Sequence, residues 1–80
     1  MSYQKPQYED PLRNYFRNLT NFYQLAPHLL NAKTEEDFEI WLEKLEAIDR
    51  RSLFLYLREN KDKIDKKFLK RAQRRFVEKI

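Results

Sequence analysis

The chain has 80 residues, with 17 Lys or Arg, 13 Asp or Glu and a formal net charge of +4, and it contains neither cysteine nor glycine. With no cysteine and one histidine it lacks a disulfide framework and the Cys/His set of a structural zinc. The lack of glycine excludes a glycine-rich phosphate loop and tight hairpins that need a positive φ. We therefore expect one small domain that packing alone stabilises, without a metal or cofactor.

Long stretches of Leu, Glu, Lys and Arg, with only three prolines, predict helix nearly throughout. The expected fold is all-α: a small single-domain bundle of three to four short helices, preceded by an extended N-terminal arm. Antiparallel and irregular orthogonal arrangements both fit the short connections. No apolar run reaches the roughly 18 residues of a membrane span, and no hydrophobic signal segment follows the N-terminus. We expect a soluble cytoplasmic protein that has no membrane partner.

Residues 1–9 show no periodicity and include Pro6, which predicts the extended arm, and its tyrosines Tyr3 and Tyr8 could pack on the bundle. The helical domain is then 10–80. Asp10 followed by Pro11 is a strong helix start. Apolar residues then recur three and four positions apart: Leu12, Tyr15, Phe16, Leu19, Phe22, Tyr23 and Ala26. This pattern predicts a first helix at about 11–25 that is stopped by Pro27, with one further turn possible to residue 30.

Capping residues predict the start of two further helices. Thr34 with Asp37 three positions later resembles a capping box, and the acidic residues after Thr34 suit a helix N-terminus. The buried stripe of this second helix is expected to be Phe38, Trp41, Leu42, Leu45 and Ile48, with Glu36, Glu39, Glu43 and Glu46 on the far face. Asp49 can cap a third helix of about 50–59, which is apolar around most of its circumference and therefore belongs in the middle of the bundle.

A fourth helix is predicted to run to the chain end. Asn60 can end the third helix in the left-handed conformation, and Asp62 or Asp65 can cap the fourth. Residues 61–80 hold nine Lys or Arg against three acids. On a helical wheel the basic residues share one half-turn, opposite an apolar arc of Phe, Leu, Ala and Ile. The basic residues are Lys66, Lys67, Lys70, Arg71, Arg74 and Arg75.

This basic amphipathic helix is the main candidate for a binding surface. A helical row of cations suits the phosphates of a nucleic acid, and Lys gives little information about base sequence. The alternative is a solvated face whose counter-charge comes from residues 31–60, which sum to −3 (five Lys or Arg, eight Asp or Glu). Both interpretations remain open from the sequence.

The polar face of the first helix is a second candidate surface. Three asparagines in one helix oppose local propensity, and Asn, Gln and Arg can form paired hydrogen bonds with base edges or peptide amides. Ordinary solvation explains the same face equally simply. The candidate residues are Arg13, Asn14, Arg17, Asn18 and Asn21.

No catalytic motif is present. His28 stands beside Pro27 without a nucleophile or oxyanion signature, and the acids near residue 35 are explained as helix N-terminal charges. Trp41 is expected in the core, in line with Phe38 and Leu45. We therefore expect a protein that is not an enzyme, with neither a catalytic nor a metal site.

The sequence predicts a small binding protein that docks on a nucleic acid or a nucleoprotein assembly through its basic C-terminal helix. The alternative is a protein–protein adaptor, inhibitor or accessory subunit of a larger complex without nucleic-acid contact. Its docking surface would be the acidic face of the second helix or the aromatic arm. A homodimer is also possible, because a small bundle with this aromatic content can expose part of its apolar stripe.

Overall fold

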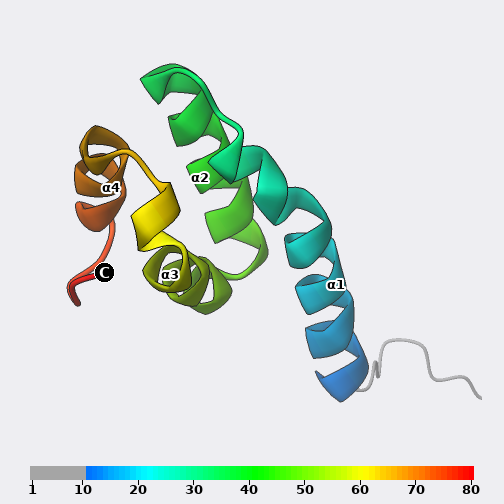
Figure 1. Ribbon diagram of the computed structural model, residues 1–80. Coiled ribbons are helices and arrows are strands. Elements are labelled where there is room, and N and C mark those ends of the chain that lie inside the picture. The colour runs from blue at the N-terminus through cyan, green and yellow to red at the C-terminus, as the bar shows by residue number, and fades with distance from the viewer. Residues whose placement is uncertain (1–10) are drawn as a thin grey trace, which may run out of the picture.

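The computed structural model describes residues 11–80, with side chains described from residue 14 onwards, and it shows a small all-α bundle (Figure 1). The elements are α1 (Pro11–Leu30), α2 (Glu35–Ile48), α3 (Arg50–Glu59), a short 3-10 turn η1 (Lys61–Lys63) and α4 (Lys66–Gln73). No strand occurs in this part of the chain, so the predicted fold class is confirmed. The expected arm at residues 1–9, with Tyr3 and Tyr8, lies outside the described residues. None of the described helices is both long and apolar enough to cross a bilayer.

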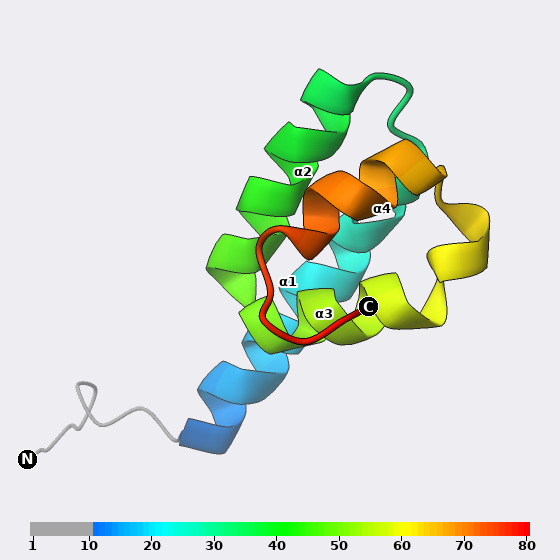
Figure 2. The same ribbon diagram turned by 90° about the vertical axis from the view of Figure 1, so that its left-hand side faces the viewer.

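The arrangement is irregular rather than a regular up-and-down bundle. α1 and α2 lie side by side and run in opposite directions, while α3 crosses them (Figures 1 and 2). α4 packs against α2 and lies on the outside of the molecule. The outer side of α4 is therefore available for contacts with other molecules.

Side-chain caps start the helices where the sequence predicts them. Thr34 accepts a 3.1 Å hydrogen bond from the backbone N–H of Asp37 at the start of α2. Asp49 accepts one of 3.2 Å from Ser52 at the start of α3, and Asp65 accepts one of 2.8 Å from the Lys67 N–H at the start of α4. Each cap satisfies an amide that has no partner inside its helix.

The first helix is longer than predicted, because Pro27 does not stop it. α1 continues to Leu30, and the carbonyl of Pro27 accepts a 3.1 Å hydrogen bond from Asn31. Proline removes one backbone donor and disfavours the helix before it. The final turn, however, buries Leu29 to 1% exposure in the core. Burial of a leucine side chain stabilises by about 2 kcal/mol, which offsets much of this cost.

The core lies between α1, α2 and α3, with contributions from α4 and from Ile64, the residue that follows η1. Its members are buried hydrophobic residues: Phe22, Ala26, Leu29, Phe38, Leu42, Leu45, Leu53, Leu57, Ile64 and Ala72. Trp41 is only partly buried at the edge of this core, so the expectation of a core tryptophan is met in part. Its ring stacks on that of His28, with 4.5 Å between centroids.

The C-terminal quarter departs most from the prediction. Asn60 has φ −111° rather than a left-handed conformation, and its side-chain amide donates a 2.8 Å hydrogen bond to the carbonyl of Tyr56. The fourth helix ends at Gln73 and does not reach the chain end. Residues 74–80 instead turn back over α3, where Phe76 packs edge-on against Phe54 at 5.4 Å. Burial of this aromatic pair favours the turn over a longer helix.

Candidate nucleic-acid interface

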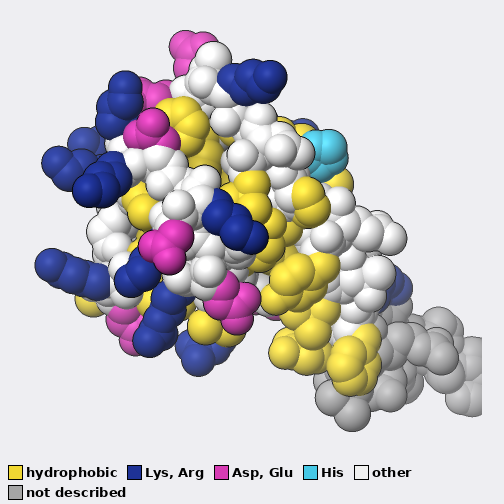
Figure 3. All heavy atoms as spheres, viewed as in Figure 1, with side chains coloured by type: hydrophobic (Ala, Val, Ile, Leu, Met, Phe, Trp, Pro, Cys, Tyr) yellow, Lys and Arg dark blue, Asp and Glu magenta, His cyan; other side chains and the backbone are white. Residues whose placement is uncertain are grey.

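α4 presents one apolar side to the bundle and one basic side to solvent. Phe68 stacks on Phe38 of α2 with 4.8 Å between ring centroids, and Ala72 is fully buried. These contacts fix how α4 is rotated about its axis. The opposite side of α4 faces outwards in Figure 2, and Lys and Arg side chains gather over this part of the molecule in Figure 3.

Arg71, one of the six predicted contact residues, is bound inside the molecule. Its guanidinium donates to Glu35 at 3.2 Å and to Glu39 at 3.4 Å, both on α2. The expectation that Arg71 belongs to a free basic face is therefore wrong. The reason is geometric, because the acidic side of α2 lies next to α4 and supplies opposite charge within contact distance.

Arg75 is held more tightly still. Its guanidinium donates to Glu39 and, at 2.6 Å, to Glu46, and Glu43 lies 3.8 Å away. Burial lowers the pKa of Arg75, but the hydrogen bonds and charges of Glu39 and Glu46 outweigh burial and leave that pKa above its ordinary value. Arg50 also binds Glu46 and donates to the carbonyl of Arg75. Arg75 is thus a structural cation and not a free contact residue.

We name this arrangement the glutamate clamp: Arg71 and Arg75 held by Glu35, Glu39, Glu43 and Glu46 of α2. It ties α4 and the start of the C-terminal segment to α2. It also occupies the acidic face of α2, which the sequence offered as the docking surface of an adaptor. The signal in the sequence is the run of glutamates at mostly four-residue spacing, which places them along one side of a helix.

Four predicted contact residues remain on the outer side, and all four are exposed: Lys66, Lys67, Lys70 and Arg74. No ion pair holds any of these four among the residues that the structure describes. The exposed Lys61 and Lys63 precede them on η1. A hollow of about 280 Å³ lies beside this row, lined by Lys66, Leu69, Lys70, Gln73 and Ile80. We name Lys66, Lys67, Lys70 and Arg74 the α4 cation row.

Gln73 shapes the end of this surface. Its side-chain amide donates a 2.7 Å hydrogen bond to the carbonyl of Glu78, and its side-chain oxygen accepts one of 2.6 Å from the N–H of Ile80. The last residues are therefore folded back against α4, where Ile80 closes one side of the hollow. Sequence periodicity gives no indication of this contact, because it depends on the helix ending at Gln73.

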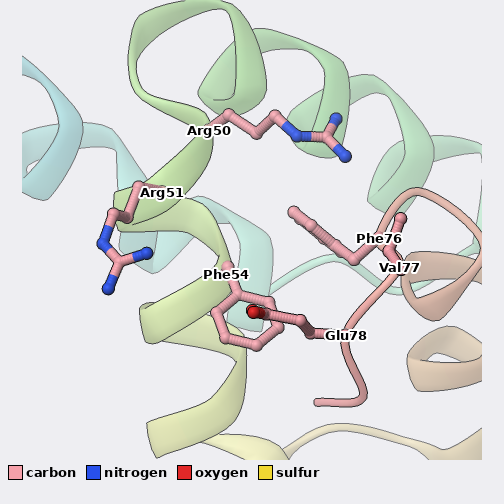
Figure 4. A pocket seen from close by; sticks show the side chains of 6 residues that line it. All are labelled: Arg50, Arg51, Phe54, Phe76, Val77 and Glu78. Carbon is pink, nitrogen blue, oxygen red and sulfur yellow. The ribbon is translucent and has the colours of Figure 1, made fainter.

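A larger cleft of about 470 Å³ lies between α3 and the C-terminal segment (Figure 4). Arg50 reaches from α3 towards the segment, and its guanidinium carbon lies 4.8 Å from the centroid of the Phe76 ring. Arg51 points away from Phe76 (Figure 4). Because Glu78 lies in the cleft wall and Arg50 is already bound, the cleft offers an anion less free positive charge than the α4 cation row does.

The second predicted surface is present on α1. Asn14 is half-buried, whereas Arg17, Asn18 and Asn21 are exposed. Arg17 donates a 2.5 Å hydrogen bond to the side-chain oxygen of Asn14. The side chain of Arg13 lies outside the described part of the structure. α1 is in contact with α2 and α3, and this polar side does not join the α4 cation row in one surface.

Comparison with known proteins gives no match: no family model, curated protein or solved structure is similar enough to this chain to indicate its family. The functional argument therefore depends on the surfaces of the chain itself.

Proposed function

We propose that this protein is a small non-enzymatic binding protein that docks on a nucleic acid, alone or within a nucleoprotein assembly, through the α4 cation row. The observation that carries the proposal is that Lys66, Lys67, Lys70 and Arg74 are exposed and hold no ion pair among the described residues. Two of the six predicted contact residues, Arg71 and Arg75, form ion pairs with α2 instead. The interface is thus smaller than the sequence predicts.

The spacing of the row suits a phosphate backbone. Lys66, Lys70 and Arg74 follow one another at four-residue intervals, which is about 6 Å of rise for each step along a helix. One strand of duplex DNA carries a phosphate about every 3.4 Å along its axis, so the row spans roughly three or four phosphates. Lys67 lies one position after Lys66 and widens the row. The hollow lined by Lys66 and Lys70 lies at the edge of the row, next to Leu69 and Ile80.

Binding of this kind is driven by the release of counterions and is largely independent of base sequence. Four contacts give a slope of roughly −3 to −4 in a plot of log affinity against log salt concentration. The affinity is therefore expected to be modest at physiological salt. A second contact with a partner protein would place such a weak binder at a defined position on an assembly.

The test is a salt titration of binding to mixed-sequence DNA and RNA, measured by fluorescence anisotropy. Lys66→Glu combined with Lys70→Glu should flatten the salt slope by about two contacts. The matched control is Lys33→Glu with Arg51→Glu, which changes the net charge equally at exposed positions outside the row. An equal loss in both variants would show that net charge alone, and not this surface, determines binding.

The second candidate is an adaptor without nucleic-acid contact. One observation favours it, namely that aromatic side chains of α1 are exposed: Tyr15 at 52%, Phe16 at 59% and Tyr23 at 51%. If the protein is not retained on either nucleic acid at about 50 mM salt, the adaptor becomes the better explanation.

A further inference from the structure

The two arginines of the glutamate clamp are held to different extents. The side chain of Arg75 is 20% exposed, three glutamates surround it, and its hydrogen bond to Glu46 is 2.6 Å long. The side chain of Arg71 is 38% exposed and has two partners, Glu35 at 3.2 Å and Glu39 at 3.4 Å. Long contacts between ions that solvent reaches contribute little to stability. The hold on Arg71 is therefore the weaker of the two.

Release of Arg71 leaves no buried charge without a partner. Glu39 stays bound to Arg75 when Arg71 moves away. The side chain of Glu35 is 45% exposed, and Glu35 is the first residue of α2, where the positive end of the helix dipole stabilises a carboxylate. Release of Arg75, in contrast, would take the main partner from both Glu39 and Glu46, which are only partly exposed. Arg71 can therefore change its partner with little loss of stability, whereas Arg75 cannot.

Arg71 also lies beside the α4 cation row. It follows Lys67 by four positions and precedes Arg74 by three. Residues three and four positions apart are neighbours on a helix surface. At about 100° per residue, Arg71 is about 40° from Lys67 and about 60° from Arg74 around the helix axis. A phosphate backbone that contacts Lys67 and Arg74 therefore passes next to Arg71.

A phosphate is a stronger partner for this guanidinium than Glu35 is. A guanidinium has five N–H donors, and Arg71 donates two hydrogen bonds among the described residues, one to Glu35 and one to Glu39. Its planar fork of donors matches the oxygens of a phosphate, which it can bind through two parallel hydrogen bonds. Neutralising a nucleic-acid phosphate also releases a condensed counterion, and an isolated carboxylate has no such layer of ions. A nucleic acid on the row therefore competes with Glu35 for Arg71.

We propose that Arg71 is a conditional contact residue, which binds Glu35 in the free protein and exchanges this glutamate for a backbone phosphate when the α4 cation row binds a nucleic acid. Arg75 stays in the glutamate clamp and keeps the C-terminal segment on α2. The interface then makes five phosphate contacts, and Glu35 is an internal competitor that lowers the affinity. The proposal rests on the proposed function, because the exchange needs a nucleic acid on the row.

The first test counts phosphate contacts with the full chain. Binding to the nucleic acid, DNA or RNA, that the protein prefers is titrated with salt and measured by fluorescence anisotropy. Arg71→Gln should flatten the plot of log affinity against log salt concentration by about 0.7 to 0.9, the value of one contact. The matched control, Arg51→Gln, removes the same charge at an exposed position of α3 and should leave the slope unchanged. An unchanged slope in Arg71→Gln overturns the proposal.

The second test removes the competitor. Glu35→Gln should raise the affinity about two- to fivefold, the factor that corresponds to an exposed ion pair, at an unchanged slope because Arg71 contacts a phosphate in both proteins. The matched control is Glu36→Gln, at the neighbouring exposed position, where no ion pair holds the glutamate among the described residues. In the Arg71→Gln background, Glu35→Gln should give no more than this control. Equal gains from Glu35→Gln and Glu36→Gln in the natural chain overturn the proposal.

The third test observes the arginines directly. In nuclear magnetic resonance spectra of the side-chain Nε–H groups, the signal of Arg71 should shift as nucleic acid is added, whereas that of Arg75 should stay in place. Circular dichroism checks that Arg71→Gln is folded, and the comparison of Glu35→Gln with Glu36→Gln does not depend on that variant. Binding that depends on Lys66 and Lys70 but not on Arg71 overturns this proposal alone. If the natural chain binds neither DNA nor RNA at about 50 mM salt, the proposed function is wrong and this proposal with it.

Discussion

Arg75 donates a 2.6 Å hydrogen bond to Glu46, a residue 29 positions earlier in the chain and on a different helix. This contact, with the bond from Arg75 to Glu39, holds the segment after α4 against α2. The side chains of Arg75 and Glu46 are about one-fifth exposed, so solvent screens the pair only in part. A residue that the sequence places on an outward basic face is therefore part of the internal packing.

We expect Arg75→Gln to lower the free energy of unfolding by about 2 kcal/mol, between the values typical of exposed and buried ion pairs. The variant leaves two partly buried carboxylates without their main partner. Urea denaturation followed by the fluorescence of Trp41 measures the change. Arg74→Gln is the matched control, since Arg74 is exposed, and it should shift stability by less than about 0.5 kcal/mol. Equal shifts in the two variants would show that the ion pairs of Arg75 stabilise the fold no more than an exposed arginine does.

The clamp also limits the number of cations available to a ligand. Glu39→Gln combined with Glu46→Gln releases Arg75 and weakens the hold on Arg71. If the protein binds nucleic acid, we expect tighter binding and a salt slope that is steeper by roughly one to two contacts. The control is Glu36→Gln with Glu59→Gln, which raises the net charge equally at exposed positions. A gain of the same size in the control would assign the effect to net charge alone.

The sequence predicts those parts of the fold that depend on local interactions. Thr34 and Asp49 start α2 and α3 where expected, because a helix cap is formed by residues two or three positions apart. The apolar residues that recur along α1 likewise include Phe22 and Ala26, which are buried in the core. Periodicity, however, shows which side of a helix is apolar and not how far its partners extend. The exposure of Phe16 could therefore not be predicted.

The errors concern residues whose environment is set by distant segments. Helix propensity and wheel position put Arg71 and Arg75 with the exposed lysines, but whether they bind α2 depends on how α4 packs across it. The same holds for the end of α4, since Phe76 leaves the helix to meet Phe54 on α3. Of the predicted basic surface, the part that remains on the outside is the α4 cation row.

Pro27 is a position where the fold tolerates a local penalty. It lies inside α1 and cannot donate to the carbonyl of Tyr23 as other helical residues do. We expect Pro27→Ala to raise the free energy of unfolding by about 1 kcal/mol, because the regained hydrogen bond exceeds the lost rigidity of the unfolded chain. The midpoint of thermal unfolding measures this. A decrease in stability would mean that the proline ring makes a packing contact worth more than the helical bond.

The ionisation of Tyr56, which lies at the contact between α1 and α3, makes the free energy of unfolding depend on pH in the alkaline range. Its ring packs edge-on against Phe22 at 5.9 Å and Tyr23 at 6.3 Å. Burial, and secondarily the charge that Tyr23 acquires, raise the pKa of Tyr56 above its ordinary value of 10.0. A raised pKa means that the folded state holds this proton more tightly than the unfolded chain does. The resulting stability is fully present below pH 10 and is lost as pH rises through the pKa of the folded state.

The measurement is the free energy of unfolding in urea at pH 8, 9, 10 and 11 for the natural chain and for Tyr56→Phe. We expect both curves to fall, because lysines titrate in the same range. The natural chain should fall more steeply above pH 10, and the difference between the curves isolates Tyr56 because the other groups are common to both. Parallel curves would show that Tyr56 ionises as readily in the folded state as in the unfolded chain, and that the contact between α1 and α3 does not exclude water from its hydroxyl.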